Sequence, residues 1–109
     1  MGYVEISDTS ELPEGKMKIV QVNGVAVLLV NVGGSYYAIA NKCTHMGGSL
    51  GEGTLEDSVV TCPRHGAKFD VTTGKAVGKA KIAFIKVTPK DEKSYPVKVD
   101  GSSIAVDAG

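Results

Sequence analysis

Apolar residues occur along the chain in short runs or in alternation with polar residues, and turn-forming residues separate these stretches. This pattern predicts β-strands, because an amphipathic helix would repeat its apolar positions every three to four residues over a longer span. No stretch has a convincing helical period, and residues 8–15 are expected to form a loop or at most one helical turn. The expected strands are residues 3–7, 17–22, 25–30, 35–40, 58–62, 67–71, 82–88, 95–99 and 103–107.

Dipeptides that favour tight turns connect several of these strands. Asn23-Gly24 lies between residues 17–22 and 25–30 and is one of the strongest two-residue hairpin signals. Gly33-Gly34 and Asp100-Gly101 mark further turns. The apolar run at 25–30 predicts a strand that is buried on both faces. Short strands with frequent turn signals are typical of a small antiparallel sandwich or barrel, so the expected fold class is all-β.

The composition is that of an ordinary globular protein. The 109 residues predict one domain, and 42% hydrophobic and 22% charged residues lie in the usual range. Twelve basic residues balance twelve acidic ones without a basic stripe, so nucleic acid is not an expected partner. The start of the chain lacks the pattern of a secretory signal, and its longest apolar run is too short to span a bilayer. We therefore expect a cytoplasmic protein with no membrane partner.

All cysteine and histidine residues of the chain occur in two close pairs. Cys43 and His45 form a C-x-H pair, and after sixteen intervening residues Cys62 and His65 form a C-x-x-H pair. Each pair follows an expected strand and lies in a glycine-containing segment, whose backbone freedom allows two side chains to be directed at one site. Thiolate and imidazole are ligands for zinc, iron and copper, and two of each complete a four-ligand set. The pattern therefore predicts a metal or cluster site.

Roles without a metal account for these pairs less well. Two cysteines are compatible with buried apolar positions or with one disulfide, and two histidines are compatible with scattered surface residues. None of these roles requires a histidine within three positions of each cysteine. A structural zinc site with two Cys and two His normally pairs like ligands, as C-x2-4-C and H-x3-5-H, whereas each segment here supplies one of each. On spacing alone, a zinc site is the remaining alternative.

The mixed pairs resemble those of the Rieske [2Fe–2S] ferredoxin family, in which two histidines replace two cysteines on one of the two irons. The resemblance is carried by CTHMGG at residues 43–48 and CPRHGAKFD at residues 62–70, and it extends over nearly the whole chain. It implies a Rieske-type fold of three small antiparallel sheets, formed by residues 1–109 as a single domain. It also implies two cluster-binding loops at one end, at about residues 42–50 and 61–68.

The resemblance assigns a role to each ligand residue. By analogy, Cys43 and Cys62 bind the inner iron of one [2Fe–2S] cluster, and His45 and His65 bind the outer iron. Two neutral imidazoles leave the cluster less negative than two further thiolates would, so an added electron is less unfavourable than in an all-Cys ferredoxin. An oxygenase would need a second iron held by two histidines and a carboxylate, and both histidines are already assigned. The chain is therefore expected to be an electron carrier and not an enzyme.

The neighbours of the ligand residues distinguish among Rieske proteins. High-potential members have a disulfide between the two loops, where this chain has Gly48 and Arg64. They also have hydroxyl groups near the cluster, where this chain has Ala67 and Phe69. Hydroxyl donors stabilise the added electron, so their absence lowers the reduction potential. We expect a value toward the negative end of the Rieske range, which begins at roughly −150 mV.

This pattern is similar to that of the Rieske ferredoxins that pass electrons from a reductase to an aromatic-ring dioxygenase. The expected function is therefore one-electron transfer from a reductase to a terminal oxygenase or other oxidoreductase. The main alternative is a small Rieske subunit of a larger complex, of the arsenite oxidase or nitrite reductase type. Lys42, Arg64 and Lys68 flank the ligand residues and either steer an acidic partner or form an ordinary solvated surface.

One segment departs from the family pattern. Many members have a proline-containing loop after the second ligand loop that covers the cluster, whereas residues 74–82 contain no proline. Residues 78–80 are expected to occupy the place of that loop and to form a looser cover.

Overall fold

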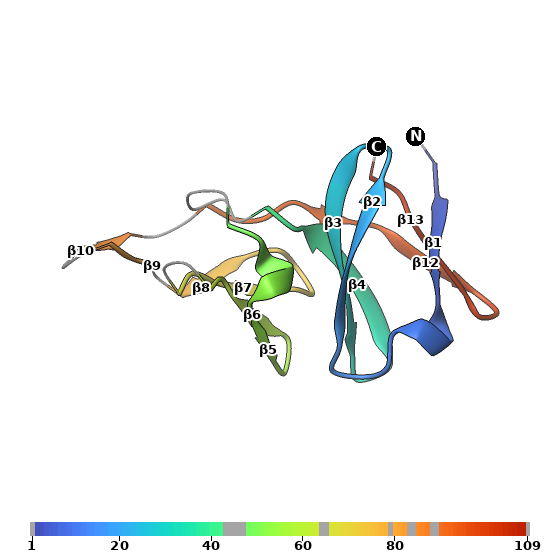
Figure 1. Cartoon of the computed structure of the whole chain (residues 1–109), viewed down its shortest axis with the longest axis horizontal. Coiled ribbons are helices and arrows are strands. Elements are labelled where there is room, and N and C mark those ends of the chain that lie inside the picture. The colour runs from blue at the N-terminus through green and yellow to red at the C-terminus, as the bar shows by residue number, and fades with distance from the viewer. Residues whose placement is uncertain are drawn as a thin grey trace.

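The computed structural model describes residues 2–42, 48–63, 66–78, 80–82, 85–87 and 90–108 of the chain. Within these residues, the regular elements are β-strands and two three-residue 3-10 turns, η1 (Thr9–Glu11) and η2 (Leu50–Glu52). No helix in this part of the chain is long and apolar enough to cross a membrane. Three antiparallel sheets of three or four strands form the body of the molecule, and a separate two-stranded sheet lies beyond them (Figure 1). The predicted all-β fold of three small antiparallel sheets is confirmed.

The central sheet contains the predicted Asn-Gly hairpin. Its strand order is β11-β4-β3-β2. Asn23 and Gly24 both have positive φ, 50° and 80°, as a two-residue turn that matches the strand twist requires. Val22 pairs with Val25 across this turn, so the hairpin lies where the sequence predicts it. The strands of the sheet are β2 (Met17–Val22), β3 (Val25–Val32), β4 (Ser35–Ala40) and β11 (Ser94–Tyr95).

Strand β3 is buried on both faces, as its apolar run predicts. Leu28 and Val30 belong to one hydrophobic cluster, whereas Val27 and Leu29 belong to another. All four side chains are fully buried. Because successive side chains of a strand point to opposite faces, β3 needs a packing partner on each side of the central sheet.

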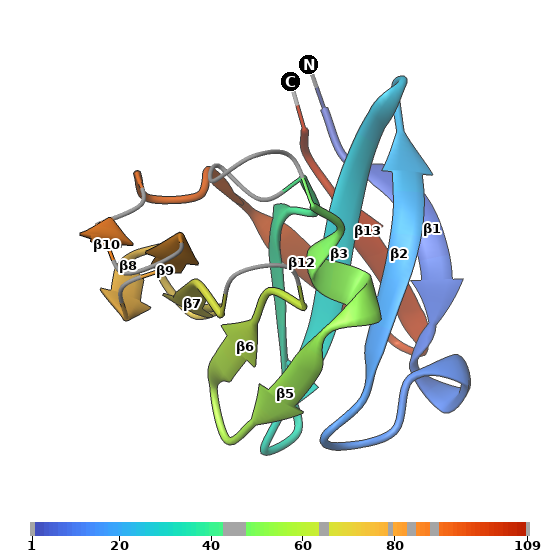
Figure 2. The ribbon, with the colours of Figure 1, turned by 60° about the vertical axis from the view of Figure 1, so that its left-hand side comes forward.

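The second sheet packs on one face of the central sheet. It has the order β1-β13-β12 and consists of β1 (Val4–Asp8), β12 (Val97–Asp100) and β13 (Ser103–Val106). Ile104 and Val106 are fully buried in the cluster that contains Val27 and Leu29. Figure 2 shows β13 and β1 beside β3 and β2, with the two chain ends close together at the top.

The third sheet packs against the other cluster of the central sheet. Its order is β5-β6-β7-β8, from β5 (Thr54–Glu56), β6 (Val59–Thr61), β7 (Lys68–Asp70) and β8 (Ala76–Gly78). Val60 and Phe69 are fully buried with Leu28 and Val30. Strands β6 and β7 lie within predicted strands. Strands β5 and β8 are additional to the prediction, because three residues such as TLE or AVG are too few to show a strand period.

The strand predicted at residues 82–88 is wrong in its limits. Strands β9 (Ala80–Ile82) and β10 (Ile85–Val87) pair antiparallel, with Ile82 opposite Ile85, so the chain reverses inside the predicted strand. A continuous apolar run gives no signal for such a reversal. In Figure 1 the pair extends from the body on the side opposite the chain ends. A two-stranded sheet thus follows β8. Of residues 78–80, which are expected to form a looser cover of the cluster, Gly78 ends β8 and Ala80 begins β9, and residue 79 lies outside the described residues.

The strand predicted at residues 95–99 is divided between two sheets. Tyr95 of β11 pairs with Ala38 of β4, whereas Val97 of β12 pairs with Val106 of β13. Pro96 lies between them. Because proline has no N–H to donate to a strand ladder, the chain leaves one sheet and enters the next at this residue.

The predicted single helical turn is η1, which begins with a capping box. The Asp8 carboxylate accepts a hydrogen bond from the Ser10 N–H at 2.9 Å, and the Glu11 carboxylate accepts one from the Asp8 N–H at 3.3 Å. These bonds hold the pKa of both carboxyl groups below its ordinary value. Their contribution to stability is therefore present above the ordinary carboxyl range and is lost as the pH falls through the lowered pKa values.

Candidate metal centre

Cys62 is the one predicted ligand residue that lies among the described residues; Cys43, His45 and His65 lie outside them. The chain is described up to Lys42 and again from Gly48, and up to residue 63 and again from residue 66. The structure therefore shows how the bases of the two predicted loops are held, together with the surroundings of Cys62.

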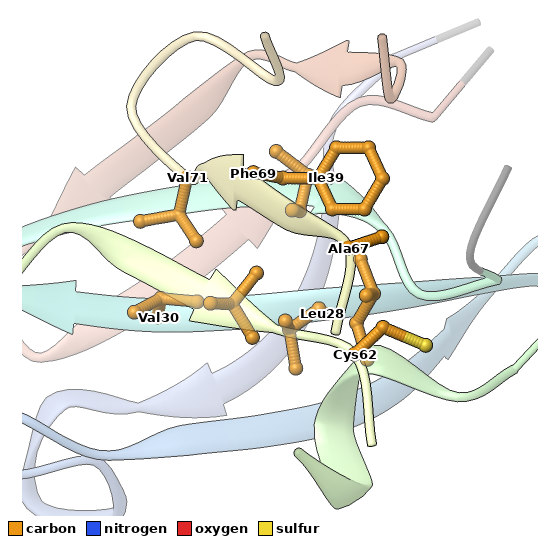
Figure 3. Packing of buried hydrophobic residues seen from close by; sticks show 9 residues of the cluster. Leu28, Val30, Ile39, Cys62, Ala67, Phe69 and Val71 are labelled. Atoms are coloured by element: carbon orange, nitrogen blue, oxygen red, sulfur yellow. The ribbon is translucent and has the colours of Figure 1, made fainter. Parts of the chain in front are cut away.

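Cys62 directly follows β6 and is 2% exposed. It belongs to the hydrophobic cluster that contains Leu28, Ala67 and Phe69, and it is not part of a disulfide. Figure 3 shows its sulfur at the edge of this cluster, directed away from Leu28 and Val30. A thiol in this position can bind a metal on its outer side, while the apolar cluster keeps water from its inner side.

The base of the second loop is a tight connection between β6 and β7. The Cys62 N–H donates to the Ala67 carbonyl oxygen at 2.7 Å, and the Gly66 N–H donates to the Cys62 carbonyl oxygen at 3.2 Å. Gly66 has a φ of 76°, a conformation that residues with a β-carbon rarely adopt. The glycine after the C-x-x-H pair therefore allows the chain to turn back directly into β7.

The base of the first loop is closed by contacts between the residues before the loop and the residues after it. Lys42 and Ser49 form an isolated antiparallel bridge, and the Leu50 N–H donates to the Asn41 carbonyl oxygen at 2.9 Å. The segment that carries Cys43 and His45 thus leaves and returns at the same place. Sequence reasoning did not single out Asn41, whose only signal is a polar residue between an apolar strand and the C-x-H pair.

Close packing between η2 and β6 joins the two loop bases. Gly53 ends η2, and a β-carbon at this residue would collide with the carbonyl oxygen of Thr61, the residue before Cys62. Leu50 of η2 is fully buried in the same cluster as Cys62. The chain that leaves the first loop is therefore held directly against the chain that enters the second.

These surroundings fit the cluster that the resemblance implies. A buried thiol outside a disulfide provides a soft ligand, and the two closed loop bases lie next to it. Ala67 and Phe69 are fully buried and carry no hydroxyl group, as the low-potential prediction requires. Lys42 and Lys68 are exposed, one at the base of each loop.

Comparison with known proteins identifies the family. Residues 2–89 match the family model described as Rieske [2Fe–2S] domain, so the chain belongs to the Rieske family. The chain is 36% identical over 104 residues to the ferredoxin component of the naphthalene 1,2-dioxygenase/salicylate 5-hydroxylase systems of a Ralstonia species. This alignment covers 94% of this chain and 91% of that protein. It is 36% identical over 107 residues to the ferredoxin component of biphenyl 2,3-dioxygenase from Rhodococcus jostii strain RHA1, covering 98% and 94%.

Solved structures agree with this assignment. The ferredoxin of carbazole 1,9a-dioxygenase from Nocardioides aromaticivorans IC177 matches with a TM-score of 0.84 and 32% identity over 100% of both chains. The terminal oxygenase of carbazole 1,9a-dioxygenase from the same organism matches with a TM-score of 0.82 and 29% identity, but only 30% of that chain is covered. The chain matches the ferredoxin components over nearly their whole length. It is a Rieske-type ferredoxin, an electron carrier with a [2Fe–2S] cofactor and not a catalytic oxygenase.

Proposed function

We propose that this chain carries single electrons from a reductase to the terminal oxygenase of a dioxygenase system, as a cytoplasmic protein whose residues 1–109 form one Rieske domain. Its relatives are named as ferredoxin components of such systems. A further structure, with a TM-score of 0.80 and 28% identity, is a complex of oxygenase and ferredoxin in carbazole 1,9a-dioxygenase. The balanced charge of the chain also favours protein partners over nucleic acid.

We propose further that Cys43 and Cys62 bind one iron and that His45 and His65 bind the other, within loops at about residues 42–50 and 61–68. The observation that carries this assignment is the buried Cys62 thiol beside the closed bases of both loops. When bound, the cluster supplies the capacity to accept and release one electron. Each loop would then contribute one ligand to each iron, which explains why every cysteine has a histidine close to it.

The residues around Cys62 support electron transfer by keeping its side of the site rigid and dry. Leu28, Ala67 and Phe69 are fully buried in one cluster with it. Closely packed apolar side chains limit the rearrangement of protein and water when the charge of the site changes by one electron. The protein thus orients and shields the cofactor, and the partner proteins supply and remove the electron.

Substitution of Cys62 tests the ligand assignment. Cys62→Ala removes one thiolate, so we expect complete loss of the visible absorption and of the spin-resonance signal after dithionite reduction, with lower thermal stability. Thr61→Ala changes the half-buried neighbouring side chain and should keep both signals. A Cys62→Ala protein with the full visible spectrum would contradict the assignment.

Electron transfer is tested with purified partners. A reductase and a terminal oxygenase of a dioxygenase system from the same cells are mixed with or without this protein, and stopped-flow absorbance follows reduction of the oxygenase. We expect fast reduction with the cluster-containing protein and little with the Cys62→Ala variant. Reduction at the same rate without the protein would contradict a role as carrier. Permanent co-purification with a large catalytic subunit would support a fixed subunit instead.

A further inference from the structure

Asn41 is a buried polar residue at the point where the chain leaves the central sheet for the first ligand segment. It directly follows β4, is 7% exposed, and lies two positions before Cys43. Its backbone N–H donates to the Ala26 carbonyl oxygen at 3.0 Å, which continues the pairing between β4 and β3. A buried amide side chain needs partners for both its NH₂ group and its oxygen.

The Asn41 side chain has these partners on the far side of the ligand segment. Its Nδ2 donates to Ser49 Oγ at 2.9 Å, and its Oδ1 accepts a hydrogen bond from the Gly51 N–H at 2.8 Å. The Asn41 carbonyl oxygen accepts a further bond from the Leu50 N–H at 2.9 Å. Ser49, Leu50 and Gly51, which follow the ligand segment, are therefore all hydrogen-bonded to Asn41, which lies before it.

These bonds take the place of an ordinary helix cap. Ser49 occupies the N-cap position of η2, yet its own side chain makes no cap hydrogen bond. An N-cap side chain usually accepts a bond from the second or third amide of the helix, and here Asn41 accepts the bond of the second residue, Gly51. A β-carbon on Gly51 would collide with Ile19 and lie 3.1 Å from Asn41 Oδ1. The cap therefore comes from outside the turn and connects the entry of the segment to its exit.

We propose that Asn41 is a positioning residue for the cluster. By fixing the spacing between Asn41 on one side of the ligand segment and Ser49 to Gly51 on the other, it would limit the opening of the proposed cluster site. The amide is neutral, so it acts through the shape of the loop and not through charge. The inference rests on the ligand assignment proposed above.

Asn31 provides a matched control in the same sheet. It is 4% exposed, its Nδ2 donates to the Leu12 carbonyl oxygen at 2.9 Å, and its Oδ1 accepts from the Gly34 N–H at 2.9 Å. Asn41 is bonded to Ala26, which is five residues from Asn31 along β3, or about 17 Å at about 3.4 Å per residue. The two asparagines thus have similar burial and bonding, but Asn31 is remote from the ligand segment.

The test compares Asn41→Ala, Ser49→Ala and Asn31→Ala in the cluster-containing protein. Visible absorbance in the presence of an iron chelator gives the rate of cluster loss, and spin resonance after dithionite reduction gives the g values. Because Asn41→Ala leaves the partly buried Gly51 N–H without its partner, we expect cluster loss about tenfold faster, with shifted or broadened g values. Ser49→Ala removes one of the two side-chain bonds and should show a smaller change in the same direction. Asn31→Ala should lower thermal stability to a similar degree without changing the g values or the rate.

Two results would overturn the proposal: equal acceleration of cluster loss by Asn31→Ala and Asn41→Ala, or unchanged g values in Asn41→Ala. If Asn41→Ala does not fold, the comparison of Ser49→Ala with Asn31→Ala decides in the same way. Absence of a Rieske signal from the unsubstituted protein would contradict the proposed function instead, so the two failures are distinguishable.

Discussion

Individual side chains around Cys62 are expected to set how readily the protein accepts an electron. Ala67 and Phe69 are fully buried in the same cluster as Cys62, and neither can donate a hydrogen bond from its side chain. Added negative charge at the cluster would therefore receive no hydroxyl donor from these two positions. The reduction potential is expected to lie toward the negative end of the Rieske range for this reason.

Introducing the two hydroxyl groups tests whether their absence lowers the potential. The double variant Ala67→Ser, Phe69→Tyr should raise the reduction potential, because each new donor stabilises the reduced state more than the oxidised one. A difference of about 1.4 kcal/mol between the two states corresponds to a rise of about 59 mV, measured by redox titration. Ala38→Ser places a hydroxyl in the other buried cluster and serves as the control. The Ala38→Ser control should lower stability and leave the reduction potential unchanged. An unchanged potential in the double variant would contradict a role for positions 67 and 69.

At the level of elements, the contact between η2 and β6 holds the two loop bases together. Gly53 has a φ of −87° and a ψ of −156°, which is an extended backbone conformation. Alanine also adopts extended conformations. Its need for glycine therefore comes from the neighbouring Thr61 carbonyl oxygen and not from an unusual conformation. The contact is between backbone and backbone, so no side-chain rotation can relieve a collision there.

Gly53→Ala should therefore separate η2 from β6. We expect a marked loss of thermal stability and faster loss of the cluster, because both loop bases must shift. Gly34→Ala is the comparison, since Gly34 has a φ of 90° in the turn between β3 and β4 and has open space around it. That variant should lose only about 1–2 kcal/mol from the left-handed conformation and retain its cluster normally. Normal cluster retention in Gly53→Ala would show that the loop bases do not depend on this contact.

At the scale of the whole molecule, the chain is elongated, with extents of 48 × 27 × 19 Å. The sheet of β5 to β8, which Cys62 adjoins, lies on one side of the central sheet, and the sheet of β1, β12 and β13 lies on the other (Figure 1). The net charge is zero, so any steering of a partner depends on where charges lie. Lys42 and Lys68 are exposed at the bases of the two loops, which places positive charge beside the proposed cluster site.

Removing these two charges tests their role in docking. Lys42→Gln, Lys68→Gln should slow electron transfer to the oxygenase severalfold at low ionic strength and make the rate less sensitive to salt. Lys16→Gln removes an exposed charge beside Asn31, remote from the first loop base, and should change neither quantity. Stopped-flow rates at several salt concentrations provide the measurement. A rate that is independent of salt in the unsubstituted protein would show that these lysines form an ordinary solvated surface.

Much of the central sheet could be predicted from the sequence because its signals are local. The Asn23-Gly24 turn fixes a hairpin between adjacent strands, and the apolar run of β3 indicates burial on both faces. Pro96 is a local signal for a break in the strand expected at residues 95–99, but it does not indicate which sheet each half joins. The reversal within residues 80–87 has no such signal, because the apolar pattern continues while the pairing partner changes.

The sequence by itself determined the chemistry of this protein: two Cys/His pairs, no other cysteine or histidine, and no hydroxyl at positions 67 and 69. Ligand type follows from residue identity, so these features need no coordinates to be recognised. The tertiary structure alone decided how the loop bases are held, through Asn41 as a cap for η2 and through Gly53 against Thr61. These contacts join residues that are eight to ten positions apart in sequence, and no local propensity specifies them. They arise only when packing of the sheets brings the two loop bases together.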